Sequence, residues 1–193
     1  MARPAAFQED TVLDTVVQLF WKKGFEATSM QDLVDETGLN RSSLYNSFGS
    51  KEELFLRAMD HYIEHYSSER LAALDKGVGL RGQIQAYFDD LIHFSMGRGK
   101  GLGCLLTNSA VELAPHDAVV QAKLKQSFEN VRLRFLRLLK EGQQQKELSV
   151  KKDAEALASF FLSTIQGIRV LARSGASEAQ LKDIAAVALS TLE

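Results

Sequence analysis

The chain has 193 residues, 45% of them hydrophobic and 25% charged, which is the balance of an ordinary globular protein with room for one good core or for a small module fused to a larger one. No apolar run reaches the roughly 18 residues of a transmembrane helix, and residues 1–10 lack the apolar stretch of a secretory signal, so we expect a cytoplasmic protein without membrane contact. The net charge is −2, and the first 59 residues hold more acidic than basic side chains, so any nucleic-acid partner must be bound by a few local cations and not by a basic domain.

Helical periodicity runs through the chain, and three helices are expected in its N-terminal part. Apolar residues of the segment 13–20 fall at i, i+3, i+4 and i+7, which predicts a helix ended by Gly24. The segment Thr28-Ser-Met-Gln31 has the pattern of a capping box and predicts a short helix that ends at Gly38. Asn40 is a natural N-cap for a second short helix ending near Phe48-Gly49. Two short helices joined by a tight turn predict a helix-turn-helix, which places the start of its second helix in the DNA major groove.

The rest of the chain is expected to form six more helices, giving nine helices and no sheet. Ser50-Lys-Glu-Glu53 is another capping box and predicts a long helix that continues toward Leu74. The glycine-rich segment 97–103 predicts a flexible joint, and the polar segment 142–150 predicts a loop. Apolar spacing predicts the remaining helices over the segments 84–92, 104–114, 120–138, 157–171 and 181–192.

The second short helix carries side chains that suit contact with DNA. Its N-terminal end presents Arg41, Ser42 and Ser43, a planar cation and two short hydroxyls that can approach phosphates and base edges closely. Tyr45 adds a phenol hydroxyl, and Lys51 in the next helix can hold a flanking phosphate. A helical corner of this kind also occurs as a plain packing element in all-helical enzymes, so spacing alone leaves both interpretations open.

Residues 24–55 resemble the tetracycline-repressor family of bacterial regulators, in the patterns Gly-Phe-x-Ala-Thr-Ser-Met-x-Asp-Leu and Gly-Leu-Asn-Arg-Ser-Ser-Leu-Tyr-Asn-Ser-Phe-Gly-Ser-Lys-Glu-Glu-Leu. Segments 103–117 and 166–173 also resemble the ligand domain of one subgroup. The resemblance implies an all-α DNA-binding regulator, by default a repressor, with no catalytic step and no cofactor. Its implied partners are double-stranded, near-palindromic operator DNA, a second copy of the chain, and an unknown small-molecule effector that releases the DNA.

The resemblance also implies how the chain is divided and which residues contact DNA. Residues 1–50 would form the three-helix DNA-binding domain, and residues 51–193 the six-helix effector-binding and dimerisation domain. Leu44 and Phe48 match core positions of the family. Carried over by position, the DNA contacts are Ser29, Arg41, Ser42, Ser43, Tyr45, Asn46 and Lys51.

The single cysteine, Cys104, excludes an internal disulfide and has two interpretations. A lone buried cysteine usually behaves as a small hydrophobe. However, Cys104 is expected in the first turn of a helix, where the helix dipole, Arg98 and Lys100 would favour the thiolate. The alternative function is therefore a repressor that senses oxidants or electrophiles through this thiol. The candidate residues for the effector pocket or sensor are Cys104, Phe88, His93 and Glu112.

Two further patterns are less specific. His61 and His65 are spaced i, i+4, which can bind zinc but more simply forms a solvated or partly packed pair. The remote alternative is an all-helical metal-binding protein or enzyme built around these histidines, His93 and Glu112. The last two helices are rich in small and branched apolar residues, which would either complete the protomer core or form a dimer interface. The resemblance favours the dimer, with Leu181, Ile184 and Ala188 in the interface.

Overall fold

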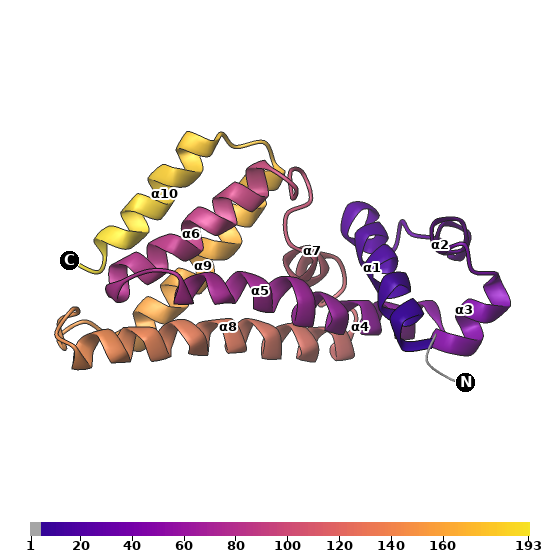
Figure 1. Cartoon of the computed structure of the whole chain (residues 1–193), viewed down its shortest axis with the longest axis horizontal. Helices are drawn as coiled ribbons and strands as arrows, with labels where there is room; N and C mark the ends of the chain where they lie inside the picture. The colour runs from indigo at the N-terminus through magenta and orange to yellow at the C-terminus, as the bar shows by residue number, and fades with distance from the viewer. Residues whose placement is uncertain (1–4) are drawn as a thin grey trace.

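The computed structural model describes residues 5–193 and is all-helical over that range (Figure 1). Residues 1–4, which include the cation Arg3 and part of the segment inspected for a secretory signal, lie outside the described residues. Over residues 5–193, each helix is too short or too polar to span a bilayer. The all-α fold expected from the periodicity is confirmed.

The first three helices form the expected helix-turn-helix module: α1 (Ala5–Lys23), α2 (Met30–Thr37) and α3 (Arg41–Phe48). The capping box of α2 lies one residue later than predicted. The Ser29 hydroxyl accepts from the Asp32 amide at 3.1 Å, and the Ser29 amide donates to the Asp32 carboxylate at 2.8 Å. Thr28 is buried, and its hydroxyl donates to the Gly24 carbonyl at 2.6 Å. Gly38 ends α2 in the left-handed conformation, with φ of +69°, as the tight turn requires.

A helical rod from Lys51 to Asp75 follows, and it is not the uniform α-helix that was predicted. It consists of α4 (Lys51–Tyr62), a π-helical segment η1 (Ile63–Ser67), α5 (Ser68–Leu71) and a 3-10 turn η2 (Ala72–Asp75). The Ser68 hydroxyl donates to the carbonyls of Ile63 and Glu64, both at 2.8 Å, and so satisfies acceptors in the widened turn. Counted as one helix, the rod brings the helices of the described residues to the predicted nine.

The remaining helices are α6 (Gly79–Met96), α7 (Leu105–Glu112), α8 (Ala118–Gln144), α9 (Ala154–Arg173) and α10 (Glu178–Ser190). The loop predicted from Gly142 starts later, because α8 continues to Gln144. Gly142 is buried inside α8, and a Cβ atom there would lie 2.6 Å from Cδ2 of Leu80. This glycine therefore allows α6 to approach α8 closely and does not end the helix.

Buried side chains form two clusters, which do not divide the chain at residue 50. One cluster fills the C-terminal bundle around Phe88, Phe135 and Phe161. The other lies beneath the helix-turn-helix and includes Leu44 and Phe55, together with residues of α7 and the start of α8. The helix-turn-helix module thus shares a core with α7 and the start of α8, so a movement of α7 changes the packing of this module.

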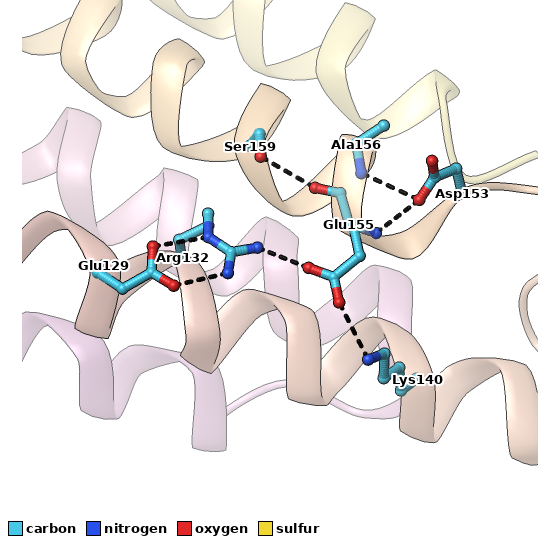
Figure 2. Close-up of polar contacts among 7 residues, drawn as sticks. All are labelled: Glu129, Arg132, Lys140, Asp153, Glu155, Ala156 and Ser159. Carbon is cyan, nitrogen blue, oxygen red and sulfur yellow. Dashed lines mark hydrogen bonds and ion pairs between the residues drawn. The ribbon is translucent and has the colours of Figure 1, made fainter.

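An ion-pair network fixes the start of α9 on α8 (Figure 2). Arg132 donates to Glu129 on its own helix at 2.6 Å and to Glu155 of α9 at 2.7 Å, and Lys140 contacts the second oxygen of Glu155 at 3.1 Å. The hydrogen bonds from Arg132 and Lys140 hold the pKa of Glu155 below its usual range. Because these carboxylates are exposed, the network orients α9 more than it stabilises the fold.

Candidate nucleic-acid interface

Helix α3 has one face in the core and one in solvent. Its N-cap residue, Asn40, accepts a hydrogen bond from the Ser43 amide at 2.8 Å. Leu44 and Phe48 are buried, as the resemblance implied. Four of the predicted DNA-contact residues share the exposed face: Arg41, Ser42, Tyr45 and Asn46. Ser43 is half-buried. The start of α3 is thus open to a ligand that lies across the helix.

This exposed face is locally cationic although the module as a whole is acidic. Residues 38–51 contain Arg41 and Lys51 and no acidic side chain. Among the described residues, Arg41 forms no ion pair, and its guanidinium lies 6.0 Å from the centre of the Tyr45 ring. In contrast, Lys23 is paired with Asp32 at 2.7 Å. The free guanidinium of Arg41 is therefore available to a phosphate or a base edge.

Lys51 and Ser29, the two predicted contacts outside α3, also hold the module together. The Lys51 ammonium donates to the carbonyls of Phe25 at 3.0 Å and Thr28 at 2.9 Å, and it lies 4.2 Å from the centre of the Phe25 ring. An ammonium has three donors, so one is left for a phosphate. The Ser29 hydroxyl donates to Asp32 at 2.8 Å within the capping box. Hydrogen bonds from Lys23 first, and then from Ser29, hold the pKa of Asp32 well below its usual range.

Glu112, which the sequence suggested for an effector pocket, ties α7 to the loop that follows α1. Its two carboxylate oxygens accept from the backbone amides of Phe25 at 3.2 Å and Glu26 at 2.9 Å. A Cβ atom at Gly24 would lie 3.0 Å from both oxygens, and the backbone of Gly24 has φ of +87°. Residues 24–28 are thus held by Glu112 through their amides and by Lys51 through their carbonyls. Sequence reasoning missed this link because its partners are 87 positions apart.

Cys104 is the N-cap residue of α7 and is 1% exposed. Its Sγ atom lies 3.2 Å from Nη1 of Arg169 and 3.6 Å from the Tyr62 hydroxyl. Burial raises the pKa of Cys104, but the charge of Arg169 and hydrogen bonds from Thr107 and Tyr62 together hold it below the ordinary thiol value. The interpretation of Arg98 and Lys100 as the activating cations is wrong, because the buried Arg169 occupies that position.

The residues of the metal-binding alternative are not all brought together within residues 5–193. The buried His61 ring contacts Asp14 at 2.8 Å through Nε2, and the rings of His61 and His65 are 4.2 Å apart. His93 is exposed on α6, while Glu112 binds the backbone of another loop. In the part of the chain that the structure describes, no three His, Cys, Asp or Glu side chains are grouped to hold a metal ion. Phe88, a further pocket candidate, is 0% exposed in the core of the bundle.

The predicted interface residues of α10 divide between the protomer core and a groove on the outer face of α9 and α10. Leu181 and Ala188 are 0% and 1% exposed within the protomer, so their side chains complete its core. Ile184 is half-buried and lines an apolar groove between the two helices, and Ala188 also contributes to the lining of this groove. Helical spacing identified an apolar face but could not separate the residues that turn inward from their neighbours that turn outward. The groove is also lined by Phe160, Gly167, Leu171 and Val187.

Comparisons with known proteins agree over the whole chain. The family described as "Bacterial regulatory proteins, tetR family" matches residues 12–58, and "Tetracyclin repressor-like, C-terminal domain" matches residues 81–187. The HTH-type transcriptional repressor ComR of Escherichia coli is 32% identical over 97% of this chain and 90% of its own length. The uncharacterised regulator YezE of Bacillus subtilis is 28% identical over 100% of both chains.

Solved structures give the same picture. The TetR family regulator CifR, as a cysteine mutant complexed with 26-bp double-strand operator DNA, is 27% identical and has a TM-score of 0.88 over 99% of this chain and all of its own. A TetR regulator from Chloroflexus aurantiacus, 24% identical, has a TM-score of 0.87 over 95% of this chain and 93% of its own, and supports the fold alone.

Proposed function

This chain belongs to the tetR family of bacterial regulatory proteins and is a DNA-binding transcriptional regulator, not an enzyme; from that premise we propose that it is a homodimeric repressor that binds a near-palindromic operator and is released by a small-molecule effector. The observation that carries the proposal is the exposed, unpaired Arg41 at the open start of α3. ComR, which is similar over nearly the whole chain, is a repressor, and this supports repression as the outcome.

In this proposal the first turn of α3 lies in the major groove. Arg41 and Asn46 reach base edges, while Ser42, Ser43 and Tyr45 contact backbone or base atoms nearby. Lys51 and Ser29 flank the groove. Lys51 contacts a phosphate with the N–H donor that the module does not use, and Ser29 does so by turning its hydroxyl away from Asp32. Because the whole module is acidic, affinity depends on these few contacts and on their doubling in a dimer.

The apolar groove of α9 and α10 is the proposed dimer interface. Phe160, Leu171 and Val187 are 41%, 41% and 67% exposed, which is costly for large apolar side chains in a lone protomer. Gly167 is exposed, and a Cβ atom there would meet nothing within 4 Å, so a partner helix can approach closely at this position. A two-fold axis at this face pairs two copies of the groove and carries two α3 helices to two half-sites.

An effector releases the DNA if it binds one arrangement of the protein, the one that does not bind DNA, more tightly than the other. Operator affinity then falls by a factor set by the difference between the effector's affinities for the two arrangements. The route for the change is α7, whose Glu112 holds the loop between α1 and α2. A shift of α7 moves the attachment of the helix-turn-helix while leaving the fold of each part intact.

A second candidate function is thiol sensing through Cys104, favoured by its contact with Arg169. The buried guanidinium has no other hydrogen-bond acceptor among the described residues, and a buried cation needs a counter-charge. A thiolate supplies it, and a thiolate is the nucleophilic form. Alkylation of Cys104 to a thioether would remove that charge, and either alkylation or oxidation would add atoms beside Arg169 and disturb the start of α7.

The test measures operator affinity by fluorescence anisotropy with DNA from upstream of the protein's own gene. Wild-type protein should bind this DNA specifically, and Arg41→Ala should lose about 1–3 kcal/mol of specific binding. Arg137→Ala, an exposed arginine on α8, is the matched control and should bind like wild type. Equal affinity of all three proteins would refute the assignment of α3. Release by an electrophile in wild type but not in Cys104→Ser would establish the second candidate function.

A further inference from the structure

A cavity of 380 Å³ lies where the DNA-binding part meets the regulatory part. Its walls come from Gln18 and Trp21 of α1, Tyr66 of the π-helical segment, Arg70 of α5, and Phe94 of α6. The volume lies in the range of sites for small molecules. Apart from the exposed His93, no residue that the sequence suggested for an effector pocket lines it.

Two buried hydrogen-bond donors on the wall of this cavity have no acceptor. Trp21 and Arg70 are 2% and 8% exposed. Neither Nε1 of Trp21 nor Nη1 of Arg70 has a hydrogen-bond partner among the described residues. Asp90 faces the guanidinium, but its Oδ2 atom is 3.9 Å from Nη1, which is beyond hydrogen-bond distance. Buried donors are nearly always satisfied, so two orphans on one cavity indicate that a ligand supplies the acceptor.

The walls around the two donors are flat and aromatic. The rings of Trp21 and Phe94 are stacked with centres 5.8 Å apart, Tyr66 meets Trp21 edge-on at 5.8 Å, and the guanidinium of Arg70 lies 4.0 Å from the centre of the Phe94 ring. Gly99 keeps the glycine-rich segment against this wall, because a Cβ atom there would lie 2.0 Å from the Phe94 ring. The segment is therefore not a free joint; it brings Arg98 and Leu102 to the cavity.

The charges of the lining select the sign of the ligand. Arg70, Lys76 and Arg98 contribute three positive charges, and Glu69 and Asp90 contribute two negative ones, so the lining carries an excess of one positive charge. A monoanion neutralises this excess, whereas a dianion would reverse it. The planar fork of a guanidinium matches a carboxylate, and the rings match an aromatic body. We propose that this cavity binds a small aromatic carboxylate, with its carboxylate on Arg70 and the indole N–H of Trp21.

The position of the site gives this ligand a role as effector, a step that rests on the proposed function. Gln18 and Trp21 belong to α1, whereas Tyr66, Arg70 and Phe94 belong to the regulatory part. A carboxylate that draws Arg70 toward Trp21 changes how α1 lies on α5 and α6. Since α1 carries the helix-turn-helix, the bound and free forms differ in operator affinity.

Benzoate and phenylacetate are the probes, and their neutral amides, benzamide and phenylacetamide, are the matched controls. Trp21 is the only tryptophan of the chain, so its fluorescence reports on this cavity directly. Both carboxylates should change the fluorescence of the full-length protein saturably. Calorimetry should give dissociation constants about tenfold or more below those of the amides, because the amides lack the charge that pairs with Arg70.

Two variants test the named donors by calorimetry. Arg70→Lys keeps the charge but loses the fork, and should weaken benzoate binding about tenfold. Trp21→Phe keeps an aromatic ring and removes an N–H that has no partner in the free protein, so it should fold normally and bind benzoate several-fold more weakly. Arg137→Lys on α8, outside the cavity, should bind like wild type.

The outcomes separate the site from the function. The site is refuted by the absence of saturable carboxylate binding, by equal affinity for acid and amide, or by wild-type affinity in Trp21→Phe. The effector role is supported if saturating benzoate lowers operator affinity about 5- to 150-fold, and it is refuted if benzoate binds but operator affinity stays constant. If the free protein binds no operator, the proposed function fails, and calorimetry still decides whether the site exists.

Discussion

Replacing Glu112 with alanine removes both acceptors that hold the loop between α1 and α2. The lost hydrogen bonds, from the amides of Phe25 at 3.2 Å and Glu26 at 2.9 Å, are charge-assisted. Such bonds contribute about 1.5–3 kcal/mol each when buried, but water can rehydrate the exposed Glu26 amide. We therefore expect a total loss of about 2 kcal/mol, which lowers the melting temperature by about 4–8 °C in a chain of this length. Glu112→Gln keeps one uncharged acceptor and should lose about half as much.

Hydrogen exchange locates the effect. The Phe25 and Glu26 amides should lose protection in Glu112→Ala, while the amides inside α9 keep theirs, and operator affinity should fall because α2 and α3 are held less firmly. Glu141→Ala, which removes an exposed glutamate of α8, is the matched control and should leave stability, exchange and affinity unchanged. If Glu112→Ala resembles this control in all three measurements, the link from α7 does not position the DNA-binding module.

Three further changes test other parts of the structure. Lys51→Ala should reduce the free energy of unfolding by about 1–2 kcal/mol in urea titrations, because two carbonyls lose their donor. It should also reduce the slope of log affinity for the operator against log salt concentration by about 1. An unchanged slope would show that Lys51 does not contact the DNA. Val187→Glu should sediment as a folded monomer and bind the operator more weakly. The control Val150→Glu, at a position that is 80% exposed in a turn, should remain dimeric. If both variants are dimers, the α9–α10 groove is not the interface. A lowered folded-state pKa stabilises the fold above the unfolded pKa, and this contribution is lost as pH falls through the folded pKa. The stability of wild type relative to Cys104→Ser should therefore rise as pH increases toward the ordinary thiol pKa and level off above it, whereas parallel stability curves would show an un-ionised thiol.

The helix-turn-helix was predictable because its determinants are local. Caps at Asn40 and Ser50, and the left-handed glycine at position 38, act within one helical turn and are visible as short patterns. The error at Thr28 has the same origin. Thr28 and Ser29 can both cap a helix, and the choice depends on whether Asp32 or Gln31 reaches back. The burial of Thr28 against Gly24, a tertiary effect, decides it.

Contacts between distant segments were not predictable from one sequence. The activating cation of Cys104 was sought nearby, at Arg98 and Lys100, yet it is Arg169, 65 positions away. Leu181 lies on an apolar face, but which side of that face meets the protomer's own core depends on the angle at which α10 crosses α6 and α9. The π-helical segment leaves no pattern in composition, because its residues also fit an α-helix.

Helix α7 links the Cys104 thiol to the helix-turn-helix module. Its first end is the Cys104 thiol, held by Arg169 of α9, and its last residue is Glu112, bound to the loop of the helix-turn-helix. The aromatic cavity contacts the same helix-turn-helix module through a different helix, because Trp21 of α1 forms part of its wall. Since α1 and α7 pack in one shared core, displacement of either changes the other's contacts. In the two proposals above, a modification of the thiol and a carboxylate in the cavity both act where α1 and α7 meet, and both are expected to change the orientation of α3.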